Sequence, residues 1–207
     1  MPRIPAGDTN VAADMDTELP SPAITGVILA GGLARRMGGR AKGLQPYAGR
    51  PLLAHAIERL QPQVATLLLN VNHDRAAYAD FGLPLIGDRF ADYPGPLAGL
   101  HAGLVAANTP WVLSVPCDSP HFPADLAARL LAAAIAERRQ IAVARAGDRM
   151  HPVFCLCHRA LAGALGDYLD SGGRRVMQWC EQAGSVVVDF PDPAAFINCN
   201  TSDDLLA

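Results

Sequence analysis

Short apolar runs and amphipathic stretches alternate along most of the chain. Ile24–Leu29 is an apolar run that leads into a glycine-rich loop, which is typical of a buried strand. Pro51–Gln61 gathers its apolar residues on one face and begins with proline, which indicates a helix. Val64–Asn72 is a second apolar run and predicts a second strand. The same pattern then predicts a short helical segment (Asp74–Phe81), a strand (Leu83–Asp88), a helix (Pro96–Ala107), a strand (Trp111–Asp118), a helix (Ala124–Arg139) and a strand (Ile141–Arg145).

The last third of the chain departs from this alternation. Arg149–His158 alternates polar and apolar residues after a turn, which is typical of an exposed or edge strand. Two helical stretches, a strand over Ser185–Phe190 and a last helix with Thr201 as its N-cap follow. Because strands and helices alternate at βαβ spacing before Arg145, most of the sheet is predicted to be parallel, with helices on both faces. The predicted fold is therefore α/β, with three α/β/α layers around a mixed sheet.

The start of the chain has a different character. Residues 1–22 mix proline, aspartate and threonine without periodicity, so we predict a flexible N-terminal extension. They contain no apolar run of the kind found in secretory signals, and no stretch approaches the roughly 18 apolar residues that span a bilayer. Residues 23–207 contain neither a linker nor an internal repeat, which predicts one domain over that range.

Composition narrows the class of ligand. Half of the 207 residues are hydrophobic and 18% are charged, as in a globular protein. The formal net charge is −3, which argues against nucleic acid or a membrane surface as a partner. Basic residues gather instead in one region, which predicts a small anionic ligand held there: Arg35, Arg36, Arg40, Lys42 and Arg50.

The five cysteines lack the spacing of a disulfide framework, so reduced thiols and a cytoplasmic location are expected. Cys155 and Cys157 lie near His151 and His158, which raises the alternative of a zinc site. Structural zinc sites usually pair cysteines two to four residues apart on a turn. Packing within the sheet is therefore the preferred interpretation of these two thiols.

The loop Leu29–Gly43, LAGGLARRMGGRAKG, contains five glycines and four cationic side chains directly behind the first predicted strand. Glycines allow a backbone to approach phosphate closely. Lys42 is followed by Gly43 rather than by serine or threonine, which excludes a Walker A loop, and the register of Gly31 and Gly32 does not fit a dinucleotide fingerprint. Flexible cations at this spacing can instead neutralise a triphosphate. A solvated basic loop is the alternative.

The segment Ile24–Leu44 resembles the signature loop of the molybdenum cofactor guanylyltransferases, the enzymes that join GMP to molybdopterin. The resemblance implies a Rossmann-like nucleotidyltransferase fold and reaches the end of the chain. Further segments match in the same order: NVN (Asn70–Asn72), DYPGPLAGL (Asp92–Leu100), PCDSP (Pro116–Pro120), HPVF (His151–Phe154), GGRRVM (Gly172–Met177) and NCNT (Asn198–Thr201).

The resemblance implies a role for particular residues. Arg36, Lys42 and Asp118 are the expected catalytic residues, with Asp118 as a Mg²⁺ ligand and Arg35 assisting. The cofactor substrate is expected to contact Gly95, Asn198 and Asn200. The nucleotide-binding residues are expected to be Leu29, Ala30, Gly31, Gly32, Gly39, Lys42, Asn70, Asp88 and Asp118.

The residue pattern alone supports part of this set. Asp118 stands at the carboxyl end of a predicted central strand, at the edge where open α/β sheets bind ligands, and carboxylates suit Mg²⁺. Asn198 and Asn200 alternate, so both side chains can face one ligand. The alternatives are a turn-forming aspartate between Pro116 and Pro120, turn-forming asparagines, and a simple helix start at Gly95.

The expected reaction is guanylyl transfer from GTP to molybdopterin with Mg²⁺ as cofactor. Ala30-Gly31-Gly32 leans toward guanine, since related cytidylyltransferases more often have Ala-Ala-Gly there. Cytidylyl transfer to molybdopterin or another phosphorylated metabolite, and a non-catalytic carrier of nucleotide or cofactor, are the alternatives. Expected protein partners are other cofactor-biosynthesis proteins or acceptor molybdoenzymes.

Overall fold

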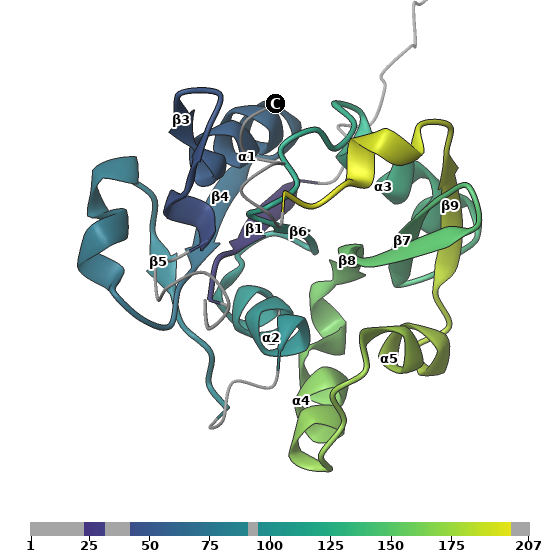
Figure 1. Ribbon diagram of the computed structural model, residues 1–207. Coiled ribbons are helices and arrows are strands. Elements are labelled where there is room, and N and C mark those ends of the chain that lie inside the picture. The colour runs from purple at the N-terminus through teal and green to yellow at the C-terminus, as the bar shows by residue number, and fades with distance from the viewer. Residues whose placement is uncertain (1–22, 32–41, 91–94, 200–207) are drawn as a thin grey trace, which may run out of the picture.

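The computed structural model describes residues 23–31, 42–90 and 95–199. Its centre is a seven-stranded sheet with strand order β5-β4-β1-β6-β8-β7-β9, covered by helices on both faces (Figure 1). The strands are β1 (Ile24–Leu29), β4 (Thr66–Asn70), β5 (Leu85–Ile86), β6 (Trp111–Pro116), β7 (Ile141–Ala146), β8 (Arg149–His158) and β9 (Val186–Phe190), and a small hairpin is formed by β2 (Pro46–Tyr47) and β3 (Arg50–Pro51).

The predicted alternation of strands and helices before Arg145 is confirmed, with shifted ends. The segment predicted over Asp74–Phe81 is a 3₁₀ helix over Arg75–Phe81. The α-helices are α1 (Leu52–Leu60), α2 (Pro96–Ala106), α3 (Leu126–Ala136), α4 (Ala162–Asp170) and α5 (Val176–Gln182). Among the described residues, no helix has the length and apolar character needed to cross a membrane.

The order of the strands creates a point where ligands bind in open α/β sheets. β1 pairs in parallel with β4 on one side and with β6 on the other, and β4 pairs in parallel with β5. The chain therefore continues from β1 to β4 on one side of the sheet and later to β6 on the other side. The carboxyl ends of these strands flank the crevice that this change of direction creates.

The two faces of the sheet are covered by different helices. α1 and α3 pack on one face, whereas α2, α4 and α5 pack on the other (Figure 1). α2 lies close to the sheet, because a Cβ at Gly103 would stand only 2.5 Å from Cγ2 of Val27. Residues on the first face include Leu53, Leu60, Leu126 and Leu130, and those on the second include Leu97, Leu104, Leu165 and Trp179.

The prediction of an exposed or edge strand for Arg149–His158 is wrong. β8 lies inside the sheet and runs antiparallel to both β6 and β7. Its second half is buried, and its first half looks exposed in sequence because it faces a pocket and contains a bulge. Val143 pairs with Cys155 and Ala144 pairs with His151, so the intervening residues of β8 have no partners on β7. Pro152, which lacks an N–H group, fits such a bulge.

Candidate functional site

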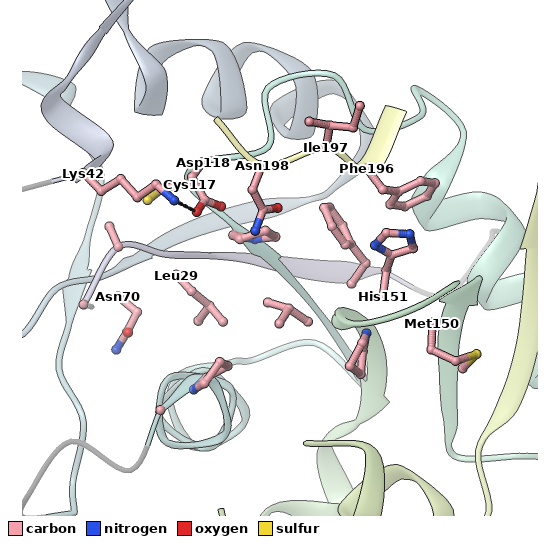
Figure 2. A pocket seen from close by; sticks show the side chains of 18 of the residues that line it. Leu29, Lys42, Asn70, Cys117, Asp118, Met150, His151, Phe196, Ile197 and Asn198 are labelled. Carbon is pink, nitrogen blue, oxygen red and sulfur yellow. Dashed lines mark hydrogen bonds and ion pairs between the residues drawn. The ribbon is translucent and has the colours of Figure 1, made fainter. Parts of the chain in front are cut away.

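A pocket of about 760 Å³ lies at the carboxyl ends of β1, β4 and β6 (Figure 2). Because β8 is antiparallel to β6, the start of β8 reaches the same edge of the sheet. Every predicted site residue that falls within the described ranges lines this pocket: Leu29, Ala30, Gly31, Lys42, Asn70, Asp88, Gly95, Asp118 and Asn198. Gly32, Arg35, Arg36, Gly39, Asn200 and Thr201, like residues 1–22, lie outside the described residues.

Lys42 and Asp118 face each other in the pocket (Figure 2). Lys42 begins a 3₁₀ turn after the glycine loop, and its Nζ donates a hydrogen bond to Oδ2 of Asp118 in an ion pair. Oδ1 of Asp118 is buried and has no hydrogen-bond partner among the described residues. Lys42 is also the only lysine in the chain; the other basic residues of the Lys and Arg type are all arginines. The site therefore combines one compact ammonium group with a carboxylate oxygen that can still accept.

Asn198 and Cys199, at the end of the described chain, hold the loop that carries Asp118. The N–H of Cys199 donates to the carbonyl of Asp118 over 2.8 Å. The hydroxyl of Ser119 donates to Oδ1 of Asn198 over 2.6 Å. Two segments that the sequence marked separately are thus joined in one wall of the pocket.

A second cluster of polar side chains lies where β4 and β5 end. Nδ2 of Asn70 donates to Oδ1 of Asp88 over 2.8 Å, and Nδ2 of Asn72 donates to Oδ2 of Asp88 over 2.8 Å. Oδ1 of Asn72 accepts from the backbone N–H of Asp88, also over 2.8 Å. The sequence prediction did not include Asn72, although the alternation in NVN places both asparagines on one side of the chain.

Two positions that line this pocket require glycine. A Cβ at Gly31 would stand 2.5 Å from Nδ2 of Asn72 and 3.0 Å from Oδ1 of Asn70, so a larger residue would displace the amides. Gly95 precedes α2 with φ 85° and ψ −159°, a backbone conformation that is essentially restricted to glycine. The N-terminus of α2 therefore enters the pocket wall through a turn that requires Gly95.

The opposite part of the pocket is largely apolar and is formed by β8 and the segment around Phe196. The His151 ring stacks on Phe196 with centroids 4.7 Å apart (Figure 2). Phe154 meets Phe196 edge-on. Burial, followed by the nearby Arg149 cation, lowers the pKa of His151, which favours the neutral imidazole. Ser114 donates to the carbonyl of Val153 over 2.7 Å and anchors the bulge of β8. The segment HPVF is part of the family resemblance, but the sequence predicted no site residue within it.

All five cysteines are free and buried. Burial, with a contribution from Asp118, raises the pKa of Cys117 to about 12, so this thiol beside the pocket stays protonated at neutral pH. Cys155 and Cys157 pack in the core on the face covered by α5. Within the described ranges, no group of three or more His, Cys, Asp or Glu side chains is arranged to hold a metal ion.

Comparisons with known proteins agree with this geometry. Residues 26–185 match the model of the MobA-like NTP transferase domain. A molybdenum cofactor guanylyltransferase of Methylibium petroleiphilum is 49% identical over 190 residues, which cover 88% of this chain and 93% of that protein. Among solved structures, the fold is similar to molybdopterin-guanine dinucleotide biosynthesis protein A of Archaeoglobus fulgidus, with a TM-score of 0.74, 20% identity, and coverage of 88% of this chain and 95% of that one.

Another similar structure is Rv0371c of Mycobacterium tuberculosis H37Rv in complex with manganese, with a TM-score of 0.65, 20% identity, and coverage of 90% of this chain and 100% of that one. At these identities the two structures establish the fold alone, whereas the family match and the 49% identical relative establish the family to which the chain belongs. The chain belongs to the MobA-like NTP transferase family, within the group of molybdenum cofactor guanylyltransferases.

Proposed function

We propose that the protein transfers GMP from GTP to the terminal phosphate of molybdopterin, which forms molybdopterin guanine dinucleotide and releases pyrophosphate. The observation that carries the proposal is the arrangement of one pocket. It has a cation and a carboxylate, Lys42 and Asp118, beside an amide-rich end around Asp88. Relatives named molybdenum cofactor guanylyltransferase, at 46–49% identity, support the same assignment.

The chemistry requires alignment and neutralisation of charge more than a protein nucleophile. An oxygen of the molybdopterin phosphate attacks the α-phosphorus of GTP, the bond from that phosphorus to the β-bridging oxygen breaks, and pyrophosphate leaves with the electron pair. The attacking phosphate is already anionic near neutral pH, since its second pKa is about 6. Lys42 stabilises the triphosphate and the departing pyrophosphate, and Arg36, with Arg35 assisting, remains a prediction for the same role.

The residues of the pocket fit a divalent cation of the Mg²⁺ type. The buried Oδ1 of Asp118, without a hydrogen-bond partner in the described part of the chain, is the hard oxygen donor that such an ion prefers. Mg²⁺ usually takes one or two carboxylates and completes its shell with phosphates and water, so a sparse protein donor set suits it. When bound, the cation neutralises charge on the phosphate oxygens. We propose Asp118 as its protein ligand.

The nucleotide and the cofactor substrate are assigned to different parts of the pocket. Leu29, Ala30 and Gly31 line the pocket together with Asn70 and Asp88, and we place the nucleoside there. Gly32 and Gly39 remain predictions as residues that admit the nucleotide. Asn198 lines the pocket on the side of β8 and Phe196, where we place molybdopterin, and Asn200 is predicted to contact it there. Gly95 precedes α2, whose Gly99 lies beside Asn70, so its predicted contact with molybdopterin would come from the other side of the pocket. A cytoplasmic location and acceptor molybdoenzymes as protein partners complete the proposal.

Nucleotide selectivity tests the proposal against cytidylyl transfer. GTP is expected to bind at least about tenfold more tightly than CTP with Mg²⁺ present, a difference of about 1.4 kcal/mol. A pocket that fits a purine leaves the contacts of a pyrimidine unmade. Calorimetric titration with GTP, CTP and ATP measures the three affinities. Equal affinity for GTP and CTP, or tighter binding of CTP, contradicts guanylyl transfer and leaves the fold assignment intact.

A further inference from the structure

Asn72 joins three segments of the pocket. It lies two residues beyond Asn70, the last residue of β4. Its side chain exchanges two hydrogen bonds with Asp88, one to Oδ2 and one from the backbone N–H, and its Nδ2 also approaches the carbonyl oxygen of Gly31 at 3.5 Å. A residue that only formed a turn would bond within its own loop, whereas Asn72 connects the ends of β1 and β4 to the segment after β5.

We propose that Asn72 is a positioning residue for the nucleoside end of GTP and that it acts by holding the carboxylate of Asp88 in one orientation. The inference rests on the proposed function. It adds Asn72, a residue that neither the sequence pattern nor the family resemblance assigned to the site.

The hydrogen bonds of Asp88 define what this carboxylate can bind. An ionised carboxylate accepts about four hydrogen bonds, two on each oxygen. Asn70 donates to Oδ1 and Asn72 donates to Oδ2, so each oxygen retains a further direction in which it can accept. Asp88 lines the pocket and has no salt bridge within the described ranges, so the two amides set its orientation. The matching ligand chemistry is a pair of N–H or O–H donors.

Asparagine has the chemistry that this position requires. Asn72 donates to the carboxylate and accepts from the backbone N–H of the same residue, so Asp88 is fixed at two points. An aspartate at position 72 would lose the donor and place a second negative charge beside the first. Gly31 provides the space for the amide, since a Cβ there would stand 2.5 Å from Nδ2 of Asn72.

A double-mutant cycle on GTP affinity tests this role. Asn72→Ala is expected to weaken GTP binding about tenfold, the scale of losing a hydrogen bond to a charged group. In the Asp88→Ala background, the same change should add less than about twofold, because a residue that acts through Asp88 has nothing left to orient. Independent, multiplicative losses in the double variant would overturn the proposal, as would unchanged affinity in Asn72→Ala.

Asn108→Ala is the matched control, because Asn108 is exposed and does not line the pocket. This variant should bind GTP like the unmodified protein. If Asn72→Ala does not fold, Asn72→Ser carries the same cycle with a smaller loss of volume. Absence of GTP binding in the unmodified protein would remove the proposed function itself, whereas normal GTP binding with no effect of Asn72 removes only this inference.

Two GTP analogues identify the donor pair. ITP lacks the exocyclic amino group of guanine, and 2′-deoxy-GTP lacks one ribose hydroxyl. If Asp88 accepts from the base, the affinity loss caused by Asn72→Ala shrinks for ITP and persists for 2′-deoxy-GTP, and the reverse holds if it accepts from the ribose. If Asn72→Ala weakens the binding of both analogues by the full tenfold, Asp88 accepts neither from the amino group of the base nor from the ribose hydroxyl, which contradicts the proposal.

Discussion

Asp118→Asn is expected to lower the rate of pyrophosphate release from GTP and molybdopterin by at least about 10²-fold, the scale of losing a main electrostatic stabiliser. The substitution preserves the size of the side chain but removes the charge that pairs with Lys42 and that we propose binds Mg²⁺. It also replaces the carboxylate by an amide, which is a poorer ligand for a hard cation. Pyrophosphate release at saturating GTP, measured over a range of Mg²⁺ concentrations, gives the loss directly.

Stability separates this role from that of a turn-forming aspartate. The Lys42–Asp118 side chains are only 26% and 14% exposed, and Oδ1 of Asp118 is buried without a hydrogen-bond partner in the described part of the chain. Asp118→Asn loses the attraction of the ion pair but also removes the cost of keeping a carboxylate largely out of water, so the two effects oppose each other and the net change is expected to stay within about 1 kcal/mol. The Tm of Asp118→Asn should therefore change by no more than about 4 °C, given the usual scaling for a domain of this size. Asp125→Asn, at an exposed carboxylate outside the pocket, is the control and should retain full activity. An active Asp118→Asn protein with a clearly lowered Tm would support the turn interpretation.

Lys42→Ala is expected to weaken GTP binding by at least about tenfold and GMP binding by less than about threefold. Hydrogen bonds to charged groups contribute about 1.5–3 kcal/mol, and a cation that serves the β- and γ-phosphates loses little with a monophosphate. Calorimetry with GTP and GMP on the same preparation measures both affinities. Arg50→Ala is the control: the sequence placed Arg50 in the basic region, but in the structure it does not line the pocket and instead pairs with the exposed Glu58, so neither affinity should change. Equal losses for GTP and GMP would instead indicate that Lys42 supports the loop.

The composition of the chain provides an independent check on Lys42. Because Lys42 is the only lysine, an amine-directed reagent has one side-chain target besides the N-terminal amine, and peptide mapping separates the two. GTP should protect Lys42 from modification more strongly than GMP does. Protection by GMP as complete as that by GTP would place the lysine away from the β- and γ-phosphates.

The sequence predicted the polar edge of the pocket because a general rule applies there. Asp118 and Asp88 stand at the carboxyl ends of predicted strands of a mainly parallel sheet, and such ends meet at one edge. Gly31 and Lys42, at the two ends of the glycine-rich segment that follows the first strand, line the pocket at the same edge. The ion pair between Lys42 and Asp118, 76 residues apart, could not be read from spacing alone, since it requires that β6 pair with β1 on the side opposite to β4.

The apolar wall was mispredicted for a physical reason. Polar–apolar alternation normally indicates one solvent-exposed face, but the first half of β8 is mostly half-buried and faces a pocket, and the bulge shifts the register beside His151. Asn72 was missed for another reason: its hydrogen-bond partner Asp88 lies on a different segment, 16 residues away. Only the three-dimensional contact distinguishes such an asparagine from a turn former.

Transfer of labelled GMP tests the central claim most directly. The protein is incubated with molybdopterin, Mg²⁺ and GTP labelled either at the α-phosphorus or at the β- and γ-phosphorus positions. Guanylyl transfer predicts that the α label appears in molybdopterin guanine dinucleotide and that the other label appears as pyrophosphate, in equal amounts. Release of the γ label as inorganic phosphate, or an α label that remains in GTP or in free GMP while molybdopterin is unchanged, would contradict the account.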